Sequence, residues 1–116
     1  MTADLPSSRW SDLLLCFCRK RQRFQVANHS MQPLLKPGDE VLLNPDAYRY
    51  AQPQVDDIVV ALHPQIPQLR IIKRVTARTA EGACVLKGDN AVASQDSRAF
   101  GAVALGSILG KVVCRF

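Results

Sequence analysis

Short apolar runs, bounded by loops with proline or glycine, recur along most of the chain after residue 39. Seven prolines and six glycines in 116 residues leave little room for long helices, because both residue types weaken or end a helix. The runs have the length and composition of strands, and they cover 40–43, 57–62, 69–75, 83–86 and 108–115. No internal repeat or second composition regime interrupts them. The pattern predicts one small, mainly β domain over residues 24–116.

An N-terminal arm, residues 1–23, precedes this domain and has a different pattern. Its large apolar residues follow helical spacing and are Trp10, Leu13, Leu14 and Phe17. This spacing predicts a short amphipathic helix over about residues 9–20. The basic residues after this helix could bind an anionic partner such as lipid or nucleic acid. Alternatively, they form a helix end that is exposed to solvent. We favour packing of the apolar face on the β domain over lipid binding.

The longest apolar run, residues 13–18, is too short to cross a membrane, which takes about 20 residues. Basic residues follow this run, whereas they precede the apolar part of a secretory signal peptide. We therefore expect a cytoplasmic protein with four reduced cysteines, Cys16, Cys18, Cys84 and Cys114. The first two would diverge on the predicted helix, so no metal or other cofactor is expected. The last two lie in strand runs and are expected in the core.

Lys73 is the odd member of an apolar strand face. Alternation along residues 69–75 places it with apolar side chains and places both arginines of the run on the other face. Apolar surroundings lower the pKa of a lysine from about 10.4, and only the neutral amine can act as a general base. The alternative is a lysine whose stem packs while its ammonium group reaches solvent.

Ser30 lies in a loop that could hold a nucleophile for such a base. Pro33 and the turn Lys36-Pro37-Gly38-Asp39 restrict this loop. The side-chain amide of Asn28 and the backbone N–H of Ser30 are candidates for an oxyanion hole. The ordinary role of a loop serine is a turn or capping hydroxyl, so Ser30 alone does not establish catalysis.

The two histidines of the chain, His29 and His63, are alternative candidates for the general base. A triad of Ser30, His63 and an aspartate fits the composition, but His63 precedes a proline at a strand end. His29 suits a surface or substrate contact better than a catalytic role. Residues 88–98 open with glycine and follow neither strand nor helix period, which indicates a loop with an internal pair, Asp96 and Arg98.

Four motifs occur in order along the chain. They are S-M-x-P-x-L-x-x-G-D from Ser30, I-K-R-V around Lys73, G-D-N-x-x-x-S-x-D-S-R-x-x-G from Gly88, and I-x-G-K near the C-terminus. Together they resemble the type I signal peptidases, which are Ser–Lys proteases. The resemblance covers about residues 26–116. It implies a small coiled β-barrel or sheet domain and a serine endopeptidase that removes an N-terminal leader from a protein precursor.

The resemblance also implies roles for individual residues. Ser30 matches the family's nucleophile, and Lys73 matches the general base of its Ser–Lys dyad. Ser94 matches a serine that orients the lysine amine. Asn28 and the Ser30 amide match the oxyanion hole. Asp96 and Arg98 match a pair of residues that braces the active-site loop in the family.

The chain departs from the larger members of this family in two ways. We expect no membrane anchor of the kind that usually precedes the catalytic serine, and the 14 residues between Lys73 and Gly88 leave no room for a second β-domain. The segment L-K-G-D-N and the C-terminal C-R-F resemble small nickel-type superoxide dismutase maturation proteases. This narrower resemblance implies a nickel superoxide dismutase proenzyme as the substrate and no cofactor in the protease itself.

Three alternative functions stay open. A membrane-associated, signal-peptidase-like processing enzyme would make peripheral contact with lipid. A self-cleaving repressor-type peptidase domain would use the same chemistry, but the 25 residues before Val26 are too few for a DNA-binding domain. A non-enzymatic basic module would bind nucleic acid or lipid through the arm, but it would leave Lys73 unexplained.

Overall fold

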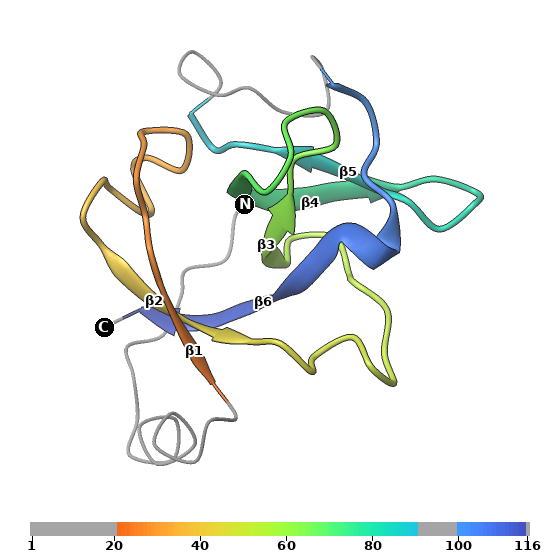
Figure 1. Cartoon of the computed structure of the whole chain (residues 1–116), viewed down its shortest axis with the longest axis horizontal. Helices are drawn as coiled ribbons and strands as arrows, with labels where there is room; N and C mark the ends of the chain where they lie inside the picture. Colours follow the sequence, from red (N-terminus) through yellow and green to blue (C-terminus); the bar gives the residue numbers. More distant parts are fainter. Residues whose placement is uncertain (1–20, 91–99, 116) are drawn as a thin grey trace.

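The structure, a computed structural model, describes residues 21–90 and 100–115. Its elements are β1 (Gln22–Gln25), β2 (Glu40–Asn44), β3 (Ile58–Leu62), β4 (Arg70–Arg78), β5 (Cys84–Lys87), the 3-10 turn η1 (Leu105–Ser107) and β6 (Ile108–Arg115). The strands form one antiparallel sheet in the order β1-β2-β6-β3-β4-β5 (Figure 1). The expectation of a small, mainly β domain is confirmed.

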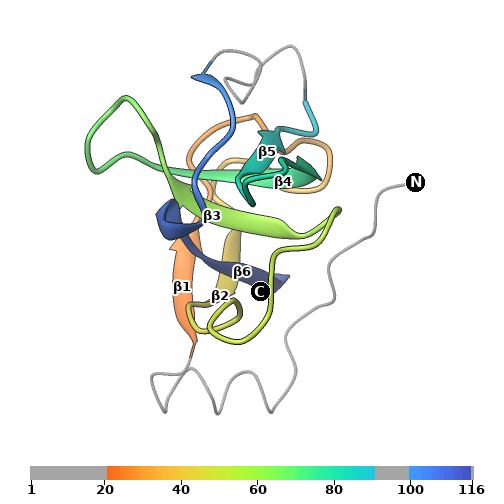
Figure 2. The same ribbon diagram turned by 90° about the vertical axis from the view of Figure 1, so that its right-hand side faces the viewer.

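The sheet is coiled, so that its two ends run in different directions. Seen from the side, β1 and β2 cross the direction of β3 and β4 (Figure 2). The pairing with the central strand β6 is irregular at two points, after Leu42 in β2 and after Val60 in β3. Such irregularities increase local twist and bend a sheet. Close approach of β2 and β6 also depends on Gly110, because a Cβ there would lie 2.6 Å from the Asn44 carbonyl oxygen.

Two apolar clusters fill the interior of this coiled sheet. The first consists of Val26, Met31, Leu35, Val41, Leu43, Ile58, Val60, Ile72 and Val112. The second consists of Val59, Ala61, Ile71, Val75, Cys84, Leu86 and Val103. Alternate residues of β3 belong to different clusters, so this strand is buried on both faces. The core positions predicted for Cys84 and Cys114 are confirmed, since both are fully buried.

The five predicted strand runs match β2 to β6 to within three residues at each end. The first strand, β1, was not predicted because it is short, polar and mostly exposed. Within the described part of the chain it is an edge strand that pairs with β2 alone, where Arg23 forms an ion pair with Glu40. No alternation of apolar and polar residues signals a strand of this kind.

The predicted helix over about residues 9–20 lies outside the described residues and stays a prediction. The sheet begins at Gln22, so β1 includes the last two residues of the range expected for the N-terminal arm. Among the residues that the structure describes, no helix is both long and apolar enough to span a bilayer.

Candidate active site

The loop that carries Ser30 leaves the sheet after β1 and returns to it at β2. Backbone hydrogen bonds join its two ends, from Val26 N–H to the Asp39 carbonyl and from Gly38 N–H to the Val26 carbonyl, each 2.8 Å long. Between them, the side chain of Met31 is fully buried in the first apolar cluster. The loop is therefore held at its ends and near Ser30, as a catalytic group requires.

Ser30 itself is buried, with 1% of its surface exposed. Its Oγ has no hydrogen-bond partner within the described part of the chain. A buried polar group without a partner costs about 1–3 kcal/mol of stability. Its presence is therefore better explained by a functional role than by a contribution to stability. Among residues 21–90 and 100–115, the Ser30 hydroxyl thus contributes no hydrogen bond to the fold, which leaves it available for chemistry.

Asn28 and the Ser30 amide lie together, but they are bonded to each other. The backbone N–H of Ser30 donates to Asn28 Oδ1 at 3.1 Å. This Asx-type contact occupies the backbone donor, so an oxyanion would have to displace the Asn28 oxygen. The predicted oxyanion role of Asn28 and Ser30 stays a prediction, and it requires a rotation of the Asn28 side chain.

Lys73 is buried on β4, with 3% of its surface exposed. It pairs with Val59 of β3, and its neighbours Ile71 and Val75 belong to the second apolar cluster. Alternation along the strand places Lys73 on this same face. The burial argues against a side chain whose ammonium group reaches solvent. The side chain is instead withdrawn from solvent, as the general-base hypothesis needs.

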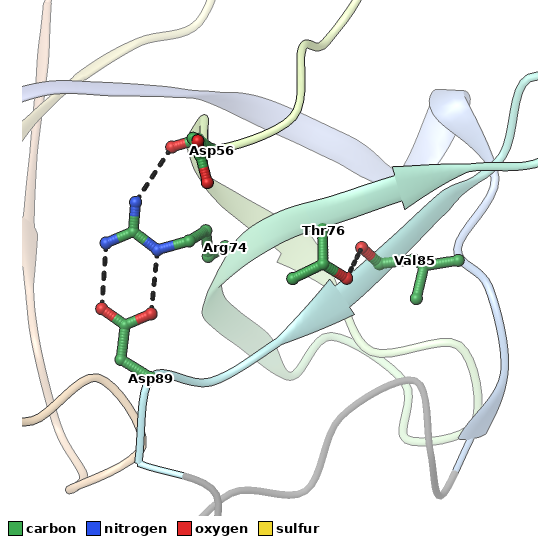
Figure 3. Close-up of polar contacts among 5 residues, drawn as sticks. All are labelled: Asp56, Arg74, Thr76, Val85 and Asp89. Atoms are coloured by element: carbon green, nitrogen blue, oxygen red, sulfur yellow. Dashed lines mark hydrogen bonds and ion pairs between the residues drawn. The ribbon is translucent and has the colours of Figure 1, made fainter. Parts of the chain in front are cut away.

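Arg74, the next residue of β4, forms an ion pair with Asp89 (Figure 3). Its Nε and Nη2 donate to the two carboxylate oxygens, each at 2.9 Å, and the side chains are only 4% and 13% exposed. The Nη1 group donates to the carbonyl of Asp56 at 3.2 Å. The hydrogen bonds to Asp89 raise the pKa of the Arg74 guanidinium above its already high ordinary value. The pair therefore stays charged.

Asn90 extends this connection to the loop of Ser30. Its backbone N–H donates to the Ser30 carbonyl at 2.8 Å, and its Nδ2 donates to the His29 carbonyl at 3.1 Å. The residue after Lys73 is thus linked through Asp89 and Asn90 to the backbone of Ser30. No hydrogen bond joins Ser30 Oγ to Lys73 in this structure. Contacts of this type are often long in the absence of substrate.

The roles of Arg74, Asp89 and Asn90 were missed by sequence reasoning. Two of these residues stand in the G-D-N motif, so a signal was present. The partners are 15 residues apart and meet because β4 and β5 form a hairpin, in which the Thr76 hydroxyl also donates to the Val85 carbonyl (Figure 3). The local pattern around either partner does not disclose this pairing.

His63 stabilises the turn between β3 and β4. Its Nδ1 accepts hydrogen bonds from the backbone N–H groups of Gln65 and Ile66, each at 3.0 Å. Its ring also contacts Phe100, with the ring centroids 4.7 Å apart. A neutral imidazole that accepts at Nδ1 carries its proton on Nε2, so neither nitrogen is free to act as a base. The rival triad is therefore not supported.

Three predicted site residues lie outside the described residues, namely Ser94, Asp96 and Arg98. Their roles stay predictions. Within residues 21–90 and 100–115, no cluster of three or more His, Cys, Asp or Glu side chains could hold a metal ion.

Comparison with known proteins identifies the class. Residues 13–81, more than half of the chain, match the family described as signal peptidase, peptidase S26. The mitochondrial inner membrane protease subunit 2 of Danio rerio is 37% identical, and the match covers 75% of this chain and 59% of that protein. This chain belongs to the S26 signal peptidase family.

Two further relatives show the range of the family. The mitochondrial ATP-independent inner membrane protease subunit 1b of Arabidopsis thaliana is 34% identical, and the match covers 74% of this chain and 64% of that protein. Signal peptidase I of Aquifex aeolicus is 35% identical over 57 residues, covering 49% of this chain and 22% of that protein. The chain thus spans less than two thirds of the length of these relatives.

These relatives correct two expectations. The cytoplasmic location is contradicted, because several relatives are subunits of mitochondrial inner membrane proteases. That expectation rested on the lack of a long apolar run, which detects a membrane span but not the membrane at which a protein works. The resemblance to signal peptidases is confirmed, but the relatives do not support the narrower one to nickel-type superoxide dismutase maturation proteases.

Proposed function

We propose that this chain contains the catalytic domain of a membrane-associated, signal-peptidase-like endopeptidase that removes an N-terminal leader from a protein precursor. The observation that carries the proposal is the burial of Lys73 in an apolar interior, one residue from the ion pair that leads to the loop of Ser30. Membership of the S26 family supports the same reaction. Burial disfavours the charged form of a lysine, which suits a general base.

In the proposed reaction, the neutral amine of Lys73 accepts the proton of Ser30 Oγ while this oxygen attacks the scissile carbonyl carbon. The tetrahedral oxyanion binds the Asn28 amide and the Ser30 N–H, after the Asn28 oxygen has moved away. The Lys73 ammonium group then donates its proton to the departing amine and leaves an acyl-enzyme on Ser30. Water, deprotonated by Lys73, releases the new carboxylate and restores the serine. Ser94 would orient the lysine amine throughout.

Membrane association is proposed from the relatives, whose names place them at the mitochondrial inner membrane. The basic residues before the sheet would support it, because Lys and Arg are attracted to anionic headgroups. The same names describe subunits, so we also propose a second protein chain as a partner. A superoxide dismutase proenzyme is a narrower substrate that no observation favours over other precursors.

The proposal is tested by incubating the purified chain with precursors that carry N-terminal leaders, with and without anionic vesicles. New N-termini are labelled and identified by mass spectrometry. We expect them with the wild-type chain and not with Ser30→Ala, and we expect vesicles to increase the rate. Equal products from both chains would refute the peptidase, and equal rates with and without vesicles would refute the membrane association.

A further inference from the structure

An open pocket of about 430 Å³ lies beside the loop of Ser30. The described residues that line it are Gln32, Pro33, Lys36 and Asn90. Three of them belong to the loop itself, and Asn90 comes from the segment after β5. The volume lies within the range of pockets that bind small ligands or side chains, roughly 300–1,000 Å³.

The pocket is joined directly to the backbone of the proposed nucleophile. Asn90 donates to the carbonyls of Ser30 and His29, at 2.8 and 3.1 Å. Gln32 is two residues from Ser30, and its backbone N–H donates to the His29 carbonyl at 3.2 Å. A group bound in the pocket therefore contacts the loop that carries the proposed nucleophile.

Two hydrogen-bond donors of the pocket are available to a ligand. The oxygen of the Gln32 side chain accepts from His29 Nδ1 at 3.1 Å. The Nε2 group of Gln32 is left as a donor. The backbone N–H of Lys36 donates to Asp39 at 2.9 Å, but this bond does not use the ammonium group. Within the described part of the chain, neither Gln32 Nε2 nor the Lys36 ammonium has a hydrogen-bond or ion-pair partner.

Among the described residues that line the pocket, Lys36 carries the charge, and a positive charge favours an anion. Lys36 supplies a positive charge on an exposed side chain. The nearest acidic residue along the β5 side, Asp89, is already paired with Arg74. Asp39 accepts from the Lys36 backbone and is the one carboxylate that opposes this charge from the loop itself. An ammonium group and an amide N–H are both donors that can bind a carboxylate.

We propose that this pocket binds an aspartate or glutamate side chain of the peptide substrate and that Lys36 determines this specificity. The proposal rests on the proposed peptidase function. It adds a preference for an acidic side chain in the substrate, which the roles of the nucleophile and base do not specify. The pocket contributes binding and selectivity, whereas the reaction itself uses Ser30 and Lys73. Lys36 is therefore expected to affect which peptide is cleaved more than how fast the bond breaks.

The test is a randomised dodecapeptide library, incubated with each chain and sequenced by mass spectrometry before and after cleavage. With the wild type we expect Asp and Glu to be enriched over Asn and Gln by roughly three- to tenfold at one position near the cleaved bond, and less at high salt. Lys36→Gln should remove the enrichment, and Lys36→Glu should reverse it in favour of Lys and Arg. Arg49→Gln, which removes a positive charge from an exposed turn outside the pocket, should leave it unchanged.

A binding experiment separates failure of the pocket from failure of the peptidase. The same library is equilibrated with immobilised Ser30→Ala, with and without Lys36→Gln, and the retained peptides are sequenced. Retention of acidic peptides that depends on Lys36 supports the pocket even if the wild type cleaves nothing, in which case only the proposed peptidase function fails. Acidic enrichment that is absent, or that persists in Lys36→Gln, overturns the pocket even if cleavage proceeds.

Discussion

Arg74 and Asp89 form a bidentate ion pair in the interior, with both nitrogen–oxygen distances at 2.9 Å. This ion pair connects the two parts of the candidate site. Arg74 follows Lys73 in β4, and Asp89 precedes Asn90, which donates to the Ser30 carbonyl. The strand of the proposed base and the loop of the proposed nucleophile are therefore held together by one charged connection. Buried pairs of this kind are tolerated where their geometry is good and further hydrogen bonds satisfy them.

Loss of this pair should destabilise the protein strongly. In Asp89→Asn, Arg74 keeps its charge in a buried position without compensation, so the free energy of unfolding should fall by about 3–5 kcal/mol. Urea denaturation measures the change. The control is Glu40→Gln, which removes the partner of Arg23 in a pair whose side chains are 60% and 38% exposed and should cost less than about 1 kcal/mol. Equal losses in the two variants would contradict a structural role for the buried pair.

Ser30→Ala should abolish processing and leave stability unchanged or slightly higher. The reason is that Ser30 Oγ is buried without a partner among the residues that the structure describes, so its removal relieves the cost of burying a polar group, about 1 kcal/mol or more. Thermal unfolding and a cleavage assay measure the two effects. Thr76→Val is the matched control, because the Thr76 hydroxyl donates to the Val85 carbonyl at 3.3 Å and its loss should lower stability. A clear destabilisation by Ser30→Ala would show that its hydroxyl supports the fold.

Lys73→Arg should be inactive although it keeps the positive charge. A guanidinium group cannot lose its proton in a protein, whereas a lysine in apolar surroundings can. The rate of the wild type should rise with pH through an apparent pKa well below about 10.4, as the amine becomes neutral. Steady-state cleavage between pH 5 and 10 measures this profile, and circular dichroism checks the fold of the variant. Activity in Lys73→Arg would exclude Lys73 as the base.

His63→Leu should lower the free energy of unfolding by about 1–3 kcal/mol. The substitution leaves the backbone N–H groups of Gln65 and Ile66 without their acceptor while keeping an apolar side chain against Phe100. His63→Asn, which retains an acceptor, should lose less. Cleavage by either variant should continue, because His63 has no place in the proposed reaction. An inactive but stable His63→Leu chain would reopen the histidine triad.

Gly110→Ala should disrupt the packing of β2 against β6. An alanine Cβ would lie 2.6 Å from the Asn44 carbonyl oxygen and 3.0 Å from the Leu43 side chain, so the backbone must shift. Overpacking of this kind costs about 1–3 kcal/mol. Gly106→Ala is the control, because a Cβ there meets nothing within 4 Å. Similar melting temperatures for the two variants would contradict this close approach of the strands.

The sequence by itself determined the strands of the core and the setting of Lys73. Short apolar runs between turn residues favour a sheet with buried faces, so β2 to β6 could be located closely. The face of Lys73 followed from alternation, which is a property of the strand alone. The strands and the face of Lys73 depend on residues that are adjacent in the sequence, so each segment by itself contains the pattern that determines them.

Only the tertiary structure decided which distant groups meet. β1 is a strand because β2 offers it hydrogen bonds, not because of its own polar residues. The contact of Asn90 with the His29 carbonyl joins residues 61 positions apart, and the pairing of Arg74 with Asp89 requires the β4–β5 hairpin. Hydrogen bonds and ion pairs act over a few ångströms, so they are set by the coiling of the sheet, which brings these segments together after the local pattern has been satisfied.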